Sequence, residues 1–165
     1  MKLTLKILES FNACHDGKMW FAAQKSRTVK GVVDKLIAQS KLDWANWTVS
    51  RMTNHDNKIR YAIFAAEQVL SIYEKQHPDD ARPRKAIEAA KKYLADKSEK
   101  NKNAANVANA AAYAAANAAA NAAYATNVAN AAYAAYAANA AYAAANAAMK
   151  EKIIRFGLTL IKDQK

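Results

Sequence analysis

NAANVANAAAYAAANAAANAAYATNVANAAYAAYAANAAYAAANAAM, residues 103–149, is the stretch that decides the fold. It runs for 47 residues without a charged residue, a glycine or a proline. Ala has the highest intrinsic helix propensity, so this Ala-rich stretch predicts helix. Each buried methyl group contributes only about 0.8 kcal/mol. An Ala-rich helix therefore needs bulkier helices to pack against.

The length of the Ala-rich stretch predicts that it folds back on itself. A single helix of 47 residues would be about 70 Å long, whereas a compact domain of this size is only about 40 Å across. The break is expected at residues 125–128, where Thr126 and Val128 flank an Asn that can cap a second helix. We therefore predict a long helical hairpin over residues 104–149.

The composition of the whole chain predicts an all-α fold. Its 165 residues include three Gly and two Pro, which leaves little sequence for turns. Apolar residues recur at helical spacing outside the Ala-rich stretch as well. The predicted fold is a single-domain helical bundle of about seven or eight helices. Its parts are mixed amphipathic helices over 1–97, a linker over 98–103, the hairpin over 104–149 and a C-terminal helix over 150–165.

Local signals place several of these helices. Residues 2–12 are expected to be helical because nothing nearby offers a strand partner, and Asp16-Gly17 is expected to be a turn. Thr28 is expected to cap a helix. The apolar stripe of that helix has i, i+3, i+4, i+7 and i+8 spacing and consists of Val29, Val32, Val33, Leu36 and Ile37.

The later helices have comparable start and stop signals. Asp43 is the expected N-cap of a helix with Trp44 and Trp47, and residues 57–76 carry a strong apolar stripe. Pro83 fits the first turn of the next helix. In the C-terminal helix, Gly157 is expected to loosen the structure.

Charge and cysteine content limit the setting of the protein. The net charge is +11, which favours nucleic acid, a nucleotide or an acidic protein as a partner, although the charges are scattered rather than clustered. Cys14 is the single cysteine, and the first residues are too short and too charged for a signal peptide. The eight Asn residues of the Ala-rich stretch that follow residue 103 argue against a membrane span. We expect a cytoplasmic protein with no membrane contact.

Catalytic and metal-binding patterns are missing from the sequence. His15, His55 and His77 lie far apart, so no metal site is expected. There is no glycine-rich phosphate loop and no nucleophile elbow. An enzyme working through His77 with Asp79 and Asp80 is a third alternative, but general acid–base groups must face one another rather than be neighbours in sequence. We expect no catalytic residues and no cofactor.

The segment His77-Pro78-Asp79-Asp80-Ala81-Arg82-Pro83-Arg84-Lys85 concentrates charge at a predicted helix start. In one interpretation it is a rigid corner, with Asp79 and Asp80 pairing with Arg82 or Arg84. In the other it recognises an anion, because Arg offers bidentate donors and a helix N-terminus offers backbone N–H groups. Both interpretations stay open at this point.

Residues 78–90, Pro-Asp-Asp-Ala-Arg-Pro-Arg-Lys-Ala-Ile-Glu-Ala-Ala, resemble the hallmark segment of a family of small immunity proteins from bacteria and phages. Two further segments resemble that family, Ala13-Cys14-His15-Asp16-Gly17 followed by Trp20, and Asp43-Trp44 followed by Trp47. Relatives carry His or Arg in their Ala-rich half, where this chain has Asn and Tyr. The resemblance implies that the protein neutralises a toxin or an immune effector by binding it.

Two functions follow from these observations. The first is a non-catalytic binding protein of immunity or anti-defence type that covers a toxin or immune effector protein. The second is a sponge for a nucleotide immune signal, in which Trp20, Trp44 and Trp47 stack on the base while Arg82 and Arg84 bind phosphate and Asn side chains read the base edge. Ala faces also permit close helix approach between subunits, which leaves a homo-oligomer open.

Overall fold

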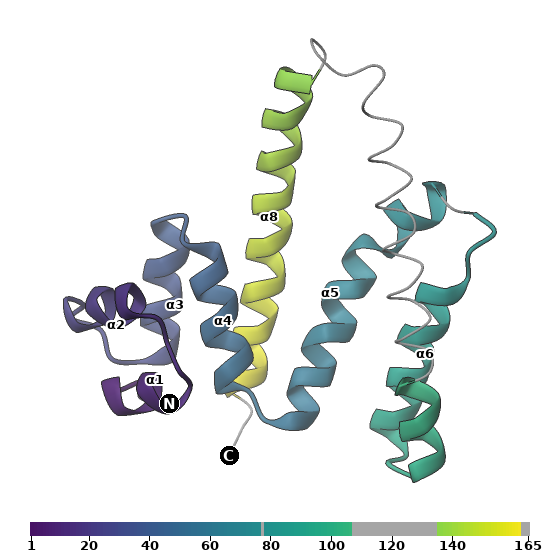
Figure 1. The fold of residues 1–165 in the computed structure, drawn as a ribbon, viewed down its shortest axis with the longest axis horizontal. Helices are drawn as coiled ribbons and strands as arrows, with labels where there is room; N and C mark the ends of the chain where they lie inside the picture. The colour runs from purple at the N-terminus through teal and green to yellow at the C-terminus, as the bar shows by residue number, and fades with distance from the viewer. Residues whose placement is uncertain (77, 107–134, 163–165) are drawn as a thin grey trace. The chain divides into compact units, whose positions relative to one another are not determined.

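A computed structural model describes residues 1–76, 78–106 and 135–162 of the chain (Figure 1). These residues form helices and no strands apart from an isolated bridge between Lys2 and Thr28, which confirms the all-α prediction. The named helices are α1 (Leu5–Ser10), α2 (His15–Ala22), α3 (Val29–Ala38), α4 (Leu42–Met52), α5 (His55–Gln76), α6 (Arg82–Ala95) and α8 (Ala135–Lys162). Residues 99–106 are also helical, so the described residues hold eight helical segments, in line with the seven or eight expected.

The chain divides into two compact units. Unit 1 consists of residues 1–61 and 145–165, and unit 2 of residues 62–144. The predicted hairpin break at residues 125–128 lies outside the described residues. The prediction of a single domain stays a prediction.

Unit 1 has a continuous apolar core. In it α3 packs against α4, and α1 packs against α2. The predicted stripe of α3 is confirmed, because four of its five members are buried and Ile37 is half-buried. The C-terminal part of α8 contributes Ile154, Leu158 and Ile161 to the same core. Five side chains of this core, Leu3, Leu8, Phe21, Val32 and Leu36, also line the candidate site.

Gly157 permits the close approach of α8 to the rest of the unit 1 core. A Cβ atom at this position would lie 2.3 Å from Val49 Cγ1 and 2.7 Å from Tyr61 Cε2. Helix α8 continues through Gly157 without a break, and the expected loosening at this residue stays a prediction. The helix also runs across the predicted boundary at residue 150, so the end of the Ala-rich stretch and the C-terminal segment form one helix.

The N-terminal residues differ from the prediction of a helix over 2–12. Leu3 N–H donates to Arg27 O at 2.7 Å and Val29 N–H donates to Met1 O at 3.1 Å, so the first residues are extended. Helix α1 begins only after Thr4, whose hydroxyl accepts from Ile7 N–H. The residues that pair with the N-terminus lie about 25 positions away in sequence, which is why local patterns did not reveal the pairing.

Two helix starts also differ from the prediction. Asp16-Gly17 is not a turn but part of α2, because Cys14 Sγ accepts from Gly17 N–H at 3.3 Å and starts the helix earlier. Asp43 is not an N-cap, because α4 begins at Leu42 and places Asp43 in its first turn. The expected Thr28 cap is confirmed, since its side chain accepts from Gly31 N–H at 3.1 Å.

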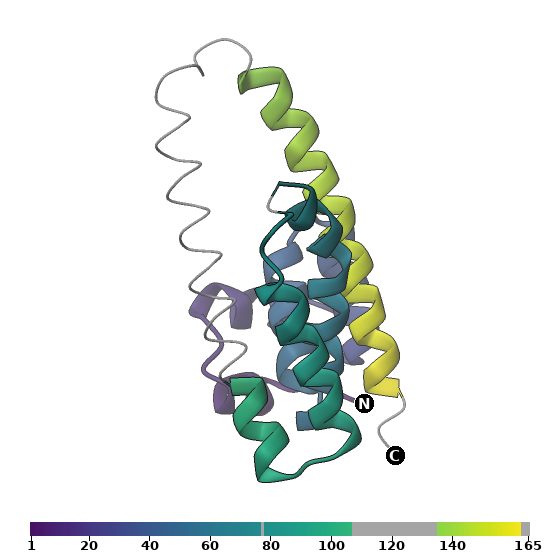
Figure 2. The ribbon, with the colours of Figure 1, turned by 90° about the vertical axis from the view of Figure 1, so that its right-hand side faces the viewer.

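Unit 2 contains the later part of α5, all of α6 and the helical residues 99–106. Charged pairs join α5 to α6, with Lys91 Nζ 2.6 Å from Glu67 Oε1. Pro83 lies in the first turn of α6, as expected. The predicted linker over 98–103 is shorter than expected, because helix resumes at residue 99 after a turn in which Ser98 bonds to the Asp96 carboxylate. Figure 2 shows this reversal after α6.

Candidate functional site

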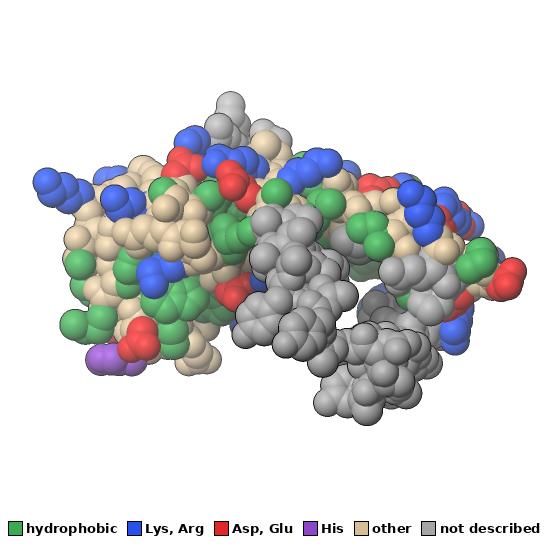
Figure 3. Space-filling model, turned by 90° about the horizontal axis from the view of Figure 1, so that it is seen from above, with side chains coloured by type: hydrophobic (Ala, Val, Ile, Leu, Met, Phe, Trp, Pro, Cys, Tyr) green, Lys and Arg blue, Asp and Glu red, His purple; other side chains and the backbone are tan. Residues whose placement is uncertain are grey.

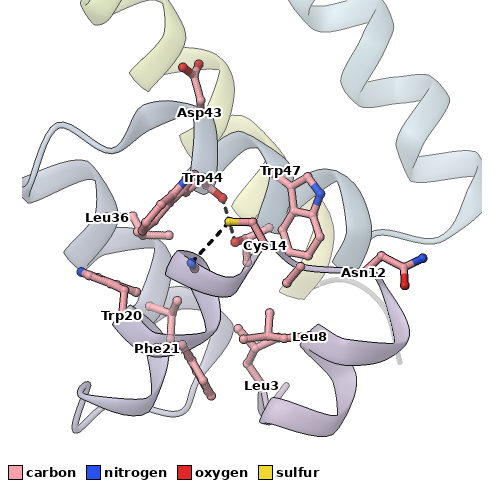
Figure 4. A pocket seen from close by; sticks show the side chains of 14 residues that line it. Leu3, Leu8, Asn12, Cys14, Trp20, Phe21, Leu36, Asp43, Trp44 and Trp47 are labelled. Atoms are coloured by element: carbon pink, nitrogen blue, oxygen red, sulfur yellow. Dashed lines mark hydrogen bonds between the residues drawn. The ribbon is translucent and has the colours of Figure 1, made fainter.

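A cavity of about 370 Å³ lies within unit 1, among helices α1 to α4. All three Trp residues of the chain border it, and most of its remaining lining is apolar (Figure 4). The lining residues are Leu3, Leu8, Asn12, Ala13, Cys14, Gly17, Trp20, Phe21, Val32, Leu36, Asp43, Trp44, Trp47 and Thr48. Four helices and the extended N-terminal residues thus meet at a single hollow, hereafter the Trp cavity.

The helices fix each Trp at the Trp cavity. Trp44 and Trp47 lie three residues apart on α4, so they project from the same side of that helix. Trp20 comes from α2 and its Nε1–H donates to Gln39 Oε1 at 2.7 Å, which ties α2 to the end of α3. All three rings are half-buried. They are therefore neither fully packed core residues nor loose surface residues.

Trp20 and Trp44 form an aromatic corner. Their ring centroids lie 6.3 Å apart with an interplanar angle of 70°, an edge-to-face arrangement. Aromatic rings favour this geometry because the positive ring edge meets the negative ring face. The pair gives the cavity one wall of ring surface, and Trp47 adds a further ring on the side of α4 (Figure 4).

Four polar side chains of the lining have hydrogen-bonding partners or point away from the rings. Cys14 Sγ accepts from Gly17 N–H, and Thr48 Oγ1 donates to Trp44 O at 2.8 Å. Asp43 is exposed, and its Oδ1 lies 3.0 Å from Lys150 Nζ. Figure 4 shows the side chains of Asp43 and Asn12 directed away from the rings. The interior consequently offers an apolar, aromatic surface with little hydrogen-bonding capacity left over.

Two cations lie on Trp rings of the cavity. Lys41 Nζ is 4.5 Å from the centroid of the Trp44 ring, and Arg51 Cζ is 5.9 Å from that of Trp47. Such cation–π contacts are attractive, but they leave the positive charge uncompensated. Among the described residues, neither Lys41 nor Arg51 forms an ion pair with a carboxylate. These two residues were missed in the sequence, although their i−3 and i+4 spacing to the Trp residues is a readable helical signal.

Arg82 and Asp80 lie in unit 2 and hold each other. Arg82 Nε and Nη2 donate to Asp80 Oδ1 and Oδ2 at 2.8 and 2.9 Å. Arg82 N–H also donates to Oδ1 at 3.0 Å, and Tyr73 OH donates to Oδ2 at 2.7 Å. These donors, Arg82 foremost, hold the pKa of the Asp80 carboxyl well below its usual range. The same bond to Asp80 raises the pKa of Tyr73.

Arg84 is paired in a similar way. Its Nε and Nη2 donate to Glu74 Oε1 and Oε2, both at 2.7 Å, in a bidentate pair that joins α6 to α5. Asp79 is exposed. Residues 73–84 are hereafter the Arg corner. The Asp80–Arg82 pair matches the rigid-corner interpretation, whereas Arg84 pairs with Glu74 instead of Asp79 or Asp80. An anion would have to displace a carboxylate at either Arg.

The predicted binding residues therefore fall into two groups. The Trp residues meet at one cavity in unit 1, and the Arg and Asp residues lie in the Arg corner of unit 2. The predicted nucleotide pocket combined both groups, and that combination stays a prediction. The cavity itself depends on side chains from dispersed segments, such as Leu3, Phe21 and Thr48, which no local motif connects.

Comparison with known proteins adds no further assignment: no protein-family model, no curated protein and no solved structure matches the chain. Over the described ranges, His, Cys, Asp and Glu do not gather in any group of three or more that could hold a metal ion. No helix in the described part of the chain is long and apolar enough to cross a membrane.

Proposed function

We propose that the protein is a non-catalytic binding protein that neutralises an acidic toxin or immune effector by covering it with unit 1. The observation that carries the proposal is the Trp cavity. Half-buried Trp residues around an apolar hollow are typical of the anchor positions of protein interfaces, where Trp and Arg dominate the binding energy. The motif resemblance to small immunity proteins supports the same class of function.

The charge distribution supports an acidic partner. Residues 1–61 and 145–165 contain 16 Lys and Arg against seven Asp and Glu, so unit 1 carries +9 of the total of +11. On the face drawn in Figure 3, Lys and Arg are scattered rather than gathered in one continuous patch. A distributed positive field accelerates encounter with an acidic partner, while the cavity supplies the contact that holds it.

The setting proposed for this function is the cytoplasm. Cys14 is a free, exposed thiol, and unpaired exposed thiols persist in reducing compartments.

Charge reversal at the cavity tests the proposal. The variant Lys41→Glu/Arg51→Glu places two acids beside Trp44 and Trp47. Its matched control is Lys92→Glu/Lys100→Glu, which has the same net charge and changes exposed residues of unit 2. Each immobilised full-length protein is used to capture host proteins, and any captured protein is then expressed in cells with and without this chain.

The expected result is an acidic protein that the wild type and the control retain and that the cavity variant retains at least about tenfold less well. Its toxicity or immune activity should fall when the wild-type chain is present. Equal capture by the two variants, or a captured protein whose activity the chain leaves unchanged, contradicts the proposal.

A nucleotide sponge is the second candidate, favoured by one observation. All three Trp residues line the same cavity, and aromatic rings stack on a nucleobase with a gain of about 1–3 kcal/mol per base. A ligand that binds only the folded state raises its melting temperature. A thermal-shift screen with linear and cyclic nucleotides should therefore show a rise for at least one of them, and the rise should vanish when Trp47 is replaced by Ala.

A further inference from the structure

We infer that the Trp cavity holds the side chain of an aromatic residue that lies in an acidic segment of the partner protein. This inference rests on the proposed function and specifies the group that the partner presents. It follows from three properties of the cavity: its size, the chemistry of its walls and the charge beside it.

The size and walls of the cavity select an uncharged ring. A volume of about 370 Å³ lies near the lower end of the range for ligand pockets, about 300–1,000 Å³. That space accommodates a group of one or two rings. Since Cys14 and Thr48 already have hydrogen-bonding partners, a charged or strongly polar group entering the hollow would lose its hydration without replacement.

Ring geometry favours an aromatic group over an aliphatic one. The edge-to-face pair of Trp20 and Trp44 presents ring surface in two orientations. A third ring can continue this packing with offset-stacked or edge-to-face contacts. An aliphatic side chain of similar size gains only the burial of apolar surface.

The positive charge beside the cavity favours acidic residues on either side of that aromatic residue in the partner's sequence. Asp43 already pairs with Lys150, so the nearest carboxylate is compensated. Lys41 and Arg51 instead lie on the rings of Trp44 and Trp47, and within the described ranges neither faces a carboxylate partner. Asp or Glu residues next to the bound ring would supply the missing negative charge. A segment with basic flanks would meet like charge.

End-blocked peptides test the inference with the full-length protein. The probe has Phe flanked on both sides by Asp and Glu, and three matched peptides replace Phe by Leu, Phe by Ala, or the acidic flanks by Lys. Quenching of Trp fluorescence reports binding, since Phe does not contribute to that signal. The alkylation rate of Cys14 gives a second readout, because this exposed thiol lines the cavity and an occupant shields it.

The expected order of affinity follows from the same contacts. Replacing Phe by Leu should weaken binding about fivefold, which corresponds to the extra value of an aromatic pair. Replacing Phe by Ala or the acidic flanks by Lys should weaken it at least about tenfold. The acidic Phe peptide should also slow Cys14 alkylation. Equal binding of the Phe and Ala peptides, or of the acidic and Lys-flanked peptides, overturns the inference.

A cavity-filling variant separates this inference from the proposed function. Ala13 lines the cavity, so Ala13→Met should fill it and abolish peptide binding, whereas Ala38→Met on the exposed end of α3 should leave binding unchanged. If Ala13→Met captures the acidic partner as well as the wild type does, the aromatic anchor is wrong while the proposed function stands. If the peptides bind as expected but no neutralised partner exists, the proposed function falls and the cavity chemistry stands.

Discussion

The three Trp residues and the Arg-rich segment both stand out in the sequence, but their side chains differ in how far their binding capacity is already satisfied within the fold. In the Arg corner, Arg82 and Arg84 each form a bidentate pair with a carboxylate of the same unit. At the Trp cavity, the rings are half-buried and enclose unfilled volume, and two nearby cations have no carboxylate partner in the described part of the chain.

This contrast shows how a charged motif and an aromatic motif differ as evidence for binding. A bidentate Arg–carboxylate pair already satisfies the geometry and charge that make Arg a good anion receptor. A ring surface that borders a hollow still has apolar area that a ligand can bury. The partners that a side chain already has, rather than its chemical type alone, decide what is left for a ligand.

The largest expected effect concerns the unit 1 core, which shares side chains with the lining of the Trp cavity. If the cavity is a defined hollow in a tightly packed core, then adding atoms to that core must be costly. The Gly157→Val variant places a branched side chain within 3 Å of Val49 and Tyr61, so we expect a loss of about 3 kcal/mol in the free energy of unfolding. Urea unfolding measures it.

Thr159→Val is the matched control for Gly157→Val, because it introduces the same residue on the exposed side of α8. A change within about 0.5 kcal/mol is expected there. If both variants unfold at the same urea concentration as the wild type, the unit 1 core around Gly157 is loosely packed and the cavity has no fixed shape.

The next effect is a loss of unit 1 stability in alkali. Tyr61 is buried and its OH donates to Asn46 Oδ1 at 2.6 Å. Burial raises the pKa of Tyr61 to about 12 from the ordinary value of 10.0. The folded state thus holds this proton more tightly, and its contribution is complete below pH 10 and is lost as the pH rises toward 12. We expect the free energy of unfolding to decrease by about 1–2 kcal/mol, which is less than the full pKa difference implies because Tyr61 is not fully shielded from solvent.

Unfolding experiments at neutral pH and at increasing alkaline pH, with Tyr61→Phe as the control, measure this effect. The Phe variant should lose the part of the pH dependence that belongs to Tyr61. A phenol that titrates at its ordinary value in the folded protein, followed by its ultraviolet absorbance, contradicts the prediction.

The third effect is the conversion of the Arg corner into an anion-binding site. Glu74→Gln removes the carboxylate that holds Arg84, so the guanidinium becomes available to an oxyanion. We expect inorganic phosphate to bind the variant at least about threefold more tightly than the wild type. The change is followed by the NMR signal of the Arg84 Nε–H group. Glu9→Gln, an exposed change of the same charge in α1, should have no such effect.

The same phosphate titration of the wild-type protein distinguishes the rigid-corner interpretation from the anion-binding interpretation. If phosphate shifts the Arg84 signal equally in the wild type and in Glu74→Gln, the carboxylate does not block the site. The contrast between the Arg corner and the Trp cavity would then disappear.

Sequence reasoning was accurate where the determining contacts are local. The Thr28 cap and the stripe of α3 depend on residues within three turns of one helix, and both were predicted correctly. The three Trp residues were also identified as candidates before the structure placed them at one cavity. Their residue type and the pairing of Trp44 with Trp47 on one helical turn were sufficient signals for that step.

The remaining features depend on contacts between distant residues. The extended N-terminus requires Arg27 and Val29, and Gly157 is explained only by the approach of α8 to Val49. Glu74 was not named as a partner of Arg84 because the two residues belong to different helices. The convergence of rings at the cavity likewise comes from the packing of α3 against α4 and from the bond between Trp20 and Gln39, which periodicity alone does not specify.

The smallest expected effect is the acid resistance of the Arg corner. The pKa of Asp80 is lowered first by the Arg82 side chain and next by the Tyr73 hydroxyl. The contribution of the carboxylate to stability is therefore present above the ordinary Asp pKa of about 3.9 and is lost only as the pH falls through the lower folded value. An NMR titration of the Asp80 carboxyl carbon should give a midpoint well below the ordinary value.

Arg82→Gln should raise that midpoint more than Tyr73→Phe does, because the guanidinium supplies two donors and a charge whereas the phenol supplies one donor. A wild-type midpoint near the ordinary value, or a larger rise in Tyr73→Phe, would show that the pairs of the Arg corner are not maintained in solution, and its two Arg residues would again be candidates for binding an anion.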